Sequence, residues 1–258
     1  MKITVKAELI KEYLRKVYLG NLVEQCVFTI EKNGTISTNV RNKTEEIFLS
    51  CYAEKILEGV ESEALWGIGD MSMFCKLLST FETGEDVTIQ ETQKVKLAIK
   101  RKKRGQFNYL LSEPEGIGEV DDEWDRNLAL ELLKRCDFGM NFKRQVASDF
   151  VTYMSIVNTS ILKVKSDSGK VTLIGGGEED HQFKLLLGSK KGTKGKFEEH
   201  YDGRLLLPII SVLDFENGDP QIYLGEDCPI AITQYDNKDI WFISKGVETT
   251  SNETDDEG

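Results

Sequence analysis

The sequence has few of the residues that usually carry out catalysis or bind metals. Histidine occurs only twice, at His181 and His200, and a surface position is the simpler interpretation for both. Cysteine occurs five times at scattered positions without a CxxC pair: Cys26, Cys51, Cys75, Cys136 and Cys228. Such a set is typical of buried thiols in a reduced intracellular protein and argues against a disulfide framework or a zinc site.

Motifs for catalysis and cofactor binding are also missing. Gly175-Gly176-Gly177 follows an expected strand, but it lacks the spacing of a dinucleotide-binding or Walker loop. No nucleophile motif occurs. Carboxylates are abundant, yet acid–base catalysis needs a pair in one cleft, and the sequence cannot place such a pair. We therefore expect no cofactor, no metal and no catalytic activity, with a carboxylate-dependent enzyme on a duplicated β scaffold as the weaker hypothesis.

Long apolar runs and an excess of positive charge are lacking as well. No run approaches the ~18 apolar residues of a membrane span, and the N-terminus has no signal-peptide pattern, so we expect an intracellular protein without a membrane partner. The net charge is −11, from 33 Lys and Arg against 44 Asp and Glu. This charge argues against a surface coated for nucleic-acid binding but is compatible with a segregated basic patch.

What the sequence does contain is the same module twice, at an offset of about 135 residues. Residues 81–89 (FETGEDVTI) align with residues 215–223 (FENGDPQIY), and a strand, a glycine turn and a strand recur at 28–36 and 162–171. Apolar residues at helical spacing predict helices over 8–18 and 71–80, and again over 147–156 and 209–215. Strands are expected between them, including one over 203–207 and a hairpin at Asn33-Gly34.

These elements predict an α+β protein of two similar domains, each an antiparallel sheet with two helices on one face. We expect an N-terminal domain over 1–111, a connector over 112–137 and a C-terminal domain over 138–246. The connector is acidic at first and then gains a helical stretch over 124–135, and we place it across the outside of the molecule. An elaborated surface loop is an equally open interpretation of the helical part. Residues 247–258 are rich in carboxylates, and we expect a disordered tail there.

Three basic features stand out against the acidic background. Residues 100–104 (KRKKR) fall where a hairpin should turn, and residues 190–196 (KKGTKGK) form a second basic loop; each is either a solvated tip or a contact for a phosphate or a partner. The third is the exposed face of the first helix, with Lys11, Arg15 and Lys16, joined by Lys76 on the second helix. Both helices hold matching places in a repeated module, so they could line one concave surface.

The order and spacing of these elements resemble the DNA sliding clamps of the proliferating cell nuclear antigen type. The resemblance is carried by residues 71–78 (MSMFCKLL), 227–232 (DCPIAI) and 240–244 (IWFIS) before the acidic tail. It implies that three two-domain subunits close into a pseudo-six-fold ring around duplex DNA, with helices lining the hole and a continuous sheet outside. It also implies a processivity factor at replicating DNA that tethers a polymerase and other proteins and is opened by an ATP-dependent clamp loader.

Residue by residue, the resemblance implies three sets of sites. Lys11 and Lys76 match channel lysines, and Arg15 and Lys16 are plausible additions, whereas Ser148, Asp149 and Thr152 stand where basic residues are expected. A pocket for partner peptides is implied at Val40, Ile47, Ile117, Pro229, Phe242 and Ser244, although Val40, Ile47 and Phe242 could equally be core. A subunit interface that pairs strand 107–111 with strand 182–187 of the next copy is implied at Phe107, Tyr109, Leu111, Phe183, Leu185 and Leu187.

Two alternatives stay open at this stage. A monomeric processivity factor could hold DNA on one basic face, and it would bind short linear duplexes with strong salt dependence. An enzyme would show metal-dependent turnover that a single Asp or Glu substitution abolishes.

Overall fold

A computed structural model describes residues 1–92, 95–101, 105–117, 125–177, 181–189, 196–218 and 220–245. The central residues of both basic loops, 102–104 and 190–195, lie outside the described residues, as does the acidic tail 247–258.

The N-terminal half follows the expected order of strands and helices. Its elements are β1 (Lys2–Lys6), α1 (Ala7–Tyr18), η1 (Leu19–Asn21), β2 (Cys26–Ile30), β3 (Ile36–Arg41), β4 (Ile47–Ala53), β5 (Leu57–Glu58), β6 (Ala64–Ile68), α2 (Met71–Ser79), β7 (Asp86–Thr92), β8 (Lys96–Arg101) and β9 (Gly105–Leu110). The hairpin at Asn33-Gly34 is confirmed: Gly34 has a φ of +88°, and a Cβ there would lie 2.2 Å from the Leu57 carbonyl oxygen.

The connector and the C-terminal half repeat most of that order. Their elements are η2 (Pro114–Gly116), α3 (Arg126–Arg135), β10 (Phe138–Asn141), α4 (Arg144–Val157), β11 (Ile161–Asp167), β12 (Lys170–Gly175), β13 (Phe183–Ser189), β14 (Phe197–Asp202), η3 (Gly203–Leu205), α5 (Leu206–Val212), β15 (Gln221–Leu224), β16 (Ile230–Gln234) and β17 (Asp239–Ile243).

The strand order shows the duplication directly. One sheet has the order β5-β1-β7-β8-β9, another has β13-β12-β11-β14, and an eight-stranded sheet has β10-β15-β16-β17-β4-β3-β2-β6. The run β6-β2-β3-β4 therefore corresponds to β14-β11-β12-β13, and β1-β7-β8-β9 corresponds to β10-β15-β16-β17. The halves join where β17 pairs with β4, with Trp241 opposite Leu49 and Ile243 opposite Ile47.

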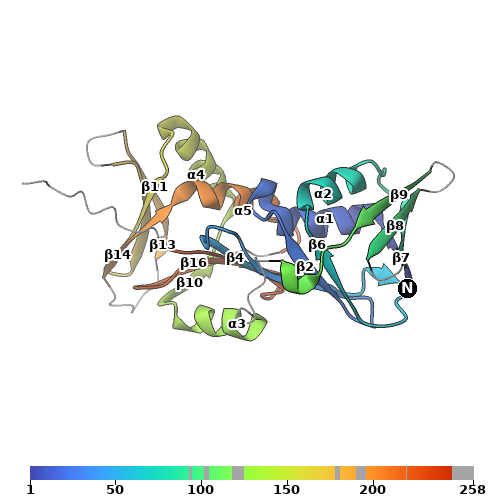
Figure 1. Ribbon diagram of the computed structural model, residues 1–258. Helices are drawn as coiled ribbons and strands as arrows, with labels where there is room; N and C mark the ends of the chain where they lie inside the picture. Colours follow the sequence, from blue (N-terminus) through green and yellow to red (C-terminus); the bar gives the residue numbers. More distant parts are fainter. Residues whose placement is uncertain are drawn as a thin grey trace, which may run out of the picture.

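The helices α1, α2, α4 and α5 lie in a row on one side of the sheets, and α3 lies on the opposite side (Figure 1). Helix α1 buries Ala7, Ile10, Leu14 and Val17, one apolar stripe at helical spacing. Helix α4 buries Ala147, Phe150 and Met154 at the same spacing. Each helix ends at a left-handed residue, Leu19 or Asn158.

One local expectation was wrong, and two short strands were not predicted. Residues 203–207 do not form a strand, because the Asp202 side chain accepts a hydrogen bond from the Arg204 backbone N–H (2.9 Å) and starts the turn η3 that leads into α5. The strand in this region is β14, which ends at Asp202, just before these residues. Strands β5 and β6 were not expected, since residues 57–68 carry little alternating pattern. None of the described helices is long and apolar enough to cross a membrane.

Candidate nucleic-acid interface and assembly surfaces

Three of the four cations expected to face DNA lie on the helix row. The Lys11 ammonium donates hydrogen bonds to the carbonyl oxygens of Ser79, the last residue of α2, at 3.5 Å and of Phe81, which follows the helix. The exposed Arg15 guanidinium donates to the Ser211 carbonyl oxygen of α5 (3.0 Å). Lys76 is exposed in the last turn of α2. These cations therefore sit at helix ends, where they also stabilise terminal carbonyl groups.

Lys16 does not lie on that exposed face, and this expectation was wrong. Its ammonium forms an ion pair with Asp239 at 2.9 Å, and it lies 4.5 Å from the centre of the Tyr235 ring. The Lys16 and Asp239 side chains are only 11% and 1% exposed. The Lys16 carbonyl oxygen also accepts a hydrogen bond from the Trp241 indole N–H (3.1 Å). The end of α1 is covered by the hairpin β16–β17. Lys16 is therefore buried in the junction between the halves and links α1 to β17.

The buried pair has an unusual electrostatic setting. Burial raises the pKa of Asp239, and the Lys16 ammonium opposes part of that rise. Burial acts to lower the pKa of Lys16, but the Asp239 carboxylate outweighs it and leaves that pKa above its ordinary value. The Tyr52 backbone N–H donates to the other Asp239 oxygen (3.2 Å). Both charges are thus held by partners in the junction, which is how a buried ion pair is tolerated.

The C-terminal half of the helix row is less basic. Arg144 begins α4 and forms an exposed ion pair with Glu216 (3.2 Å). Asp149 accepts a hydrogen bond from the Gln145 amide (2.8 Å), and Thr152 bonds back to the Ser148 carbonyl oxygen (2.9 Å). The cations of the row are therefore supplied mainly by the N-terminal half.

The residues expected to line one peptide pocket are dispersed. Val40 and Ile47 are fully buried in the main core beneath the helix row. Phe242 is 1% exposed and belongs to a separate cluster on the opposite side of the sheet, with Ala129, Leu133, Ala231 and Ile240. Successive residues of a strand alternate between faces, which separates Phe242 from Ile47, the pairing partner of Ile243. The core interpretation therefore holds for all three side chains.

The other three pocket residues also lie apart. Ile117 is 3% exposed and packs over Gly67 of β6, where a Cβ would lie 3.1 Å from its Cδ1. Strand β6 is four strands from β17 in the eight-stranded sheet, or roughly 19 Å at the usual strand spacing. Ser244 donates its backbone N–H to the Glu46 carbonyl oxygen (2.9 Å), and Pro229 is half-buried before β16. The six residues do not form one open hollow.

Helix α3 covers the outer face of the sheet at this place. Its Ala129 and Leu133 pack on Ala231 and Phe242, on the side of the sheet opposite the helix row (Figure 1). Asp125 caps the helix by accepting from the Leu128 N–H (2.8 Å). Arg126, which the sequence analysis missed, donates to the Lys238 carbonyl oxygen (3.0 Å) and lies 5.6 Å from the Tyr52 ring centre.

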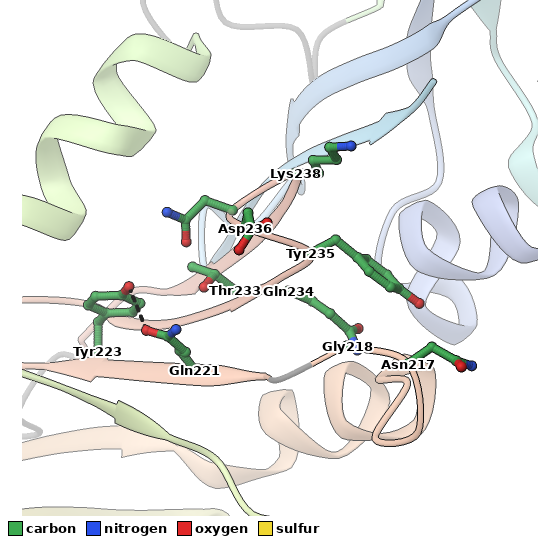
Figure 2. A pocket seen from close by; sticks show the side chains of 10 residues that line it. Asn217, Gly218, Gln221, Tyr223, Thr233, Gln234, Tyr235, Asp236 and Lys238 are labelled. Carbon is green, nitrogen blue, oxygen red and sulfur yellow. Dashed lines mark hydrogen bonds between the residues drawn. The ribbon is translucent and has the colours of Figure 1, made fainter. Parts of the chain in front are cut away.

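A polar hollow of about 520 Å³ lies beside the junction, between the β16–β17 turn and the loop that follows α5. Figure 2 shows its lining side chains, among them Tyr223, whose hydroxyl donates to Gln221 (3.0 Å). Tyr235, Asp236 and Asn237 all have positive φ, between 52° and 64°, so this turn is strained. Asp214 accepts from the Glu216 N–H (2.8 Å) and from the Tyr235 hydroxyl (3.0 Å), which holds the loop against the turn.

The strands expected at the subunit interface are edge strands. Strand β9 ends the five-stranded sheet, and β13 ends the four-stranded sheet. Phe107 is 42% exposed, and Leu111 and Leu185 are half-buried. Tyr109, Phe183 and Leu187 instead point into the core of their own sheets. These edges thus offer mainly backbone and a few apolar side chains for pairing.

Helix α4 carries exposed apolar side chains, and one of them, Tyr153, contacts β13. Ile156 is 73% exposed, Val151 is 39% exposed, and Tyr153, which packs on Phe183 at 5.6 Å between ring centres, is 37% exposed. Helix α1 buries Ala7, Ile10 and Leu14, and α4 buries Ala147, Phe150 and Met154 at the same spacing. The exposed Ile156 occupies the last turn of α4, as the buried Lys16 occupies the last turn of α1.

The described residues offer no arrangement suited to metal chemistry. Within them, no group of three or more His, Cys, Asp or Glu side chains is placed to hold a metal ion. Burial raises the pKa of Cys75 and of Cys136 to about 12, which keeps both thiols protonated and weakly reactive at neutral pH.

No protein-family model matches the chain, and no curated protein matches it in sequence. Solved structures do match over nearly the whole chain. PCNA of A. fulgidus, bound to the C-terminal region of FEN-1, has a TM-score of 0.72 at 14% identity and covers 96% of this chain and 99% of that one. The PCNA2–PCNA3 complex of Sulfolobus tokodaii gives 0.69 at 15% identity, with 95% and 99% covered.

A bacterial clamp is similar as well. A putative DNA polymerase III beta subunit from Eubacterium rectale has a TM-score of 0.72 at 14% identity and covers 95% of this chain and 65% of that one. At these identities the likeness establishes the fold and nothing finer. The chain has the α+β fold of the PCNA-type sliding clamps, as a unit of two clamp domains.

Proposed function

We propose that this chain is the subunit of a DNA sliding clamp, a non-enzymatic processivity factor that encircles duplex DNA. The observation that carries the proposal is the β17–β4 junction inside the chain. Strand β9 is the repeat equivalent of β17, and β13 is the equivalent of β4, yet both are edges in a single chain. Pairing β9 of one copy with β13 of the next repeats the internal junction and covers both edges. Three copies then supply six similar domains.

The surroundings of the β13 edge support this assembly. At the internal junction, the end of α1 is covered by the hairpin β16–β17. The same contact between copies would place the hairpin β8–β9 over the end of α4, where Ile156 and Tyr153 are exposed. Apolar side chains that are solvated in one chain would then become buried, which is the usual composition of a permanent subunit interface.

The proposed DNA-facing surface is the helix row, with Lys11, Arg15 and Lys76. Closure of the ring would turn this row inward in every copy. Cations there would attract phosphates without reading base sequence, and the net charge of −11 would discourage DNA from binding elsewhere. Retention on DNA would come from topology and not from tight contacts. The structure of A. fulgidus PCNA with a FEN-1 segment supports a role in tethering partner proteins.

The remaining assignments follow from the clamp role. We assign the polymerase and other DNA-processing proteins as partners, an ATP-dependent loader as the agent that opens the ring, and replicating DNA as the intracellular site of action. The domains would be 1–111 and 138–246, joined by the connector 112–137. No partner pocket is assigned to Val40, Ile47 and Phe242, because these side chains are buried on two different faces.

Retention on circular DNA tests the proposal. The protein, loaded with its clamp loader onto a nicked plasmid, should stay bound during gel filtration at high salt and be lost when the plasmid is cut once. Equal retention on circular and linear DNA would contradict a topological link. Tight, salt-sensitive binding to short linear duplexes by a monomer would instead support a one-faced processivity factor.

A further inference from the structure

The outer face of the four-stranded sheet carries a hollow that the clamp function does not use. Its volume is about 400 Å³, and it spans all four strands, β13, β12, β11 and β14. Its lining combines the apolar side chains of Ile161 and Ile174 with the ammonium groups of Lys163, Lys165 and Lys184. Ile161 is 46% exposed, so the hollow opens to solvent.

Positive charge exceeds negative charge in this lining. Lys163 and Lys165 both form ion pairs with the same carboxylate, Glu198, at 2.7 and 3.1 Å. Hydrogen bonds from Lys163 and then from Lys165 lower the pKa of Glu198, so it stays ionised. Lys184 lies opposite Ile174 in the next strand pair and adds a third cation. The described lining therefore has three ammonium groups and one carboxylate, in a protein whose net charge is −11.

The repeat shows that this charge is not a requirement of the fold. In the equivalent sheet of the N-terminal half, the outward positions of β2 and β3 include the uncharged Thr29, Ser37 and Asn39, and the one cation among these described positions, Arg41, is paired with Glu45 (3.3 Å). Cross-strand pairing on the C-terminal sheet instead sets Lys163 between Ile174 and His200. The same scaffold thus carries mostly uncharged side chains on β2 and β3 in one half and a cationic, partly apolar set on β11 to β13 in the other.

The lining also distinguishes between classes of anionic partner. Single-stranded nucleic acids bind through aromatic rings on which bases stack, and among the ten lining residues only His200 has a flat ring. Lys163 and Lys165 lie at alternate positions of β11, and Ile174 of β12 separates Lys163 from Lys184 of β13. This pattern matches carboxylates and apolar side chains along an extended peptide. We propose that this hollow docks an extended acidic segment of a partner protein, with its carboxylates on Lys163, Lys165 and Lys184 and an apolar side chain on Ile161 and Ile174.

A fluorescence-anisotropy titration of the full chain tests this assignment. The probe is a labelled peptide of twelve residues, made of aspartate and glutamate with two central isoleucines. The wild-type chain should bind it with an affinity that falls as salt rises, because exposed charges are screened. The variant K163E/K165E should bind at least tenfold more weakly, and K184E should bind severalfold more weakly. The control K134E makes the same single charge reversal as K184E, on the exposed face of α3, and should bind like the wild type.

Three outcomes would overturn the proposal. If K163E/K165E and K134E bind the peptide equally well, the hollow is not the peptide-binding site. A twelve-nucleotide oligo(dT) that binds more tightly than the peptide and is lost in K163E/K165E would make the hollow a nucleic-acid site. If a chain truncated after Lys245 binds the peptide at least tenfold more tightly, the chain's own acidic residues 247–258 compete for the hollow and are its occupant. Sedimentation of K163E/K165E separates these results from ring assembly, since Lys163 and Lys165 lie on an inner strand and not on the β13 edge, where Lys184 lies.

Discussion

The ends of α1 and α4 hold equivalent places in the two halves, yet their surroundings are opposite in character. At the end of α1, Lys16 is buried in an ion pair with Asp239 and lies against the Tyr235 ring. At the end of α4, Ile156 is 73% exposed. The first surface is already covered by the hairpin β16–β17, and the second has no equivalent cover within the described part of one chain. The last turn of α1 carries a charged side chain at the contact inside one chain, whereas the last turn of α4 carries an apolar side chain where a second copy is expected to bind.

This contrast has a physical reason. A junction inside one chain is never required to separate, so it can hold a buried ion pair that fixes its geometry at some cost in desolvation. A junction between chains forms from solvated surfaces, and burying apolar area provides most of the favourable free energy. The different chemistry also disfavours pairing of the wrong strands, because an unpaired Lys16 or Asp239 would be costly to bury.

The largest effect should come from breaking the internal junction. Asp239→Ala leaves the Lys16 ammonium buried without its carboxylate, and we expect a loss of about 3–5 kcal/mol in the free energy of unfolding. Urea denaturation measures this loss. The control Glu54→Ala removes the exposed pair with Lys238 and should cost less than about 1 kcal/mol. Similar small losses in both variants would show that the buried pair does not hold the halves together.

The equivalent change at α4 should affect assembly and not folding. Ile156→Lys places a charge where the hairpin of a second copy is expected, so we predict at least a tenfold rise in the dissociation constant of the oligomer. The monomer should unfold as before, because this side chain is mostly solvated in one chain. Analytical ultracentrifugation across a concentration series measures the first effect. The neighbouring exposed Ser155→Lys serves as a control for charge alone, and an unchanged oligomer in Ile156→Lys would place the subunit contact elsewhere.

A smaller, pH-dependent effect should come from Asp214, which holds Tyr235 over Lys16. The Glu216 N–H, followed by Asn217 and the Tyr235 hydroxyl, lowers the pKa of Asp214 to about 2 from 3.8. A lowered carboxyl pKa stabilises the fold above the unfolded value and loses that effect as pH falls towards the folded value. Asp214→Ala should therefore cost about 1 kcal/mol at pH 7, after allowance for solvent screening, and less between pH 4 and pH 2. Thermal melts across this range would contradict the assignment if the difference from wild type stayed constant.

Much of the fold could be predicted because it depends on patterns of residues that are close together in the sequence. The apolar stripe of Ile10, Leu14 and Val17 predicts α1, and the Asn33-Gly34 turn predicts its hairpin, since both depend on residues close in sequence. The doubled order of elements predicts two similar domains, and the solved clamps confirm the fold. The strand expected at 203–207 failed because a single capping contact from Asp202 turns the chain into a helix.

The candidate sites were harder to predict, because they depend on contacts between distant residues. Lys16 has the spacing of a surface lysine, and only the pairing of β17 with β4 brings Asp239 to it. Phe242 and Ile47 are both apolar strand residues, and the register, which sequence alone does not give, puts them on opposite faces. Arg126 gave no signal beyond the Asp125 cap, as its acceptors belong to the β16–β17 turn.

The mass of the assembly tests the central claim most directly. If β9 of one copy pairs with β13 of the next until the edges are used up, sedimentation equilibrium at micromolar concentration should give three times the 29.2 kDa of one chain. The value should stay constant over a tenfold change in concentration, because a closed ring adds no further copies. A mass of 29.2 kDa throughout, or one that grows steadily with concentration, would contradict a self-closing clamp.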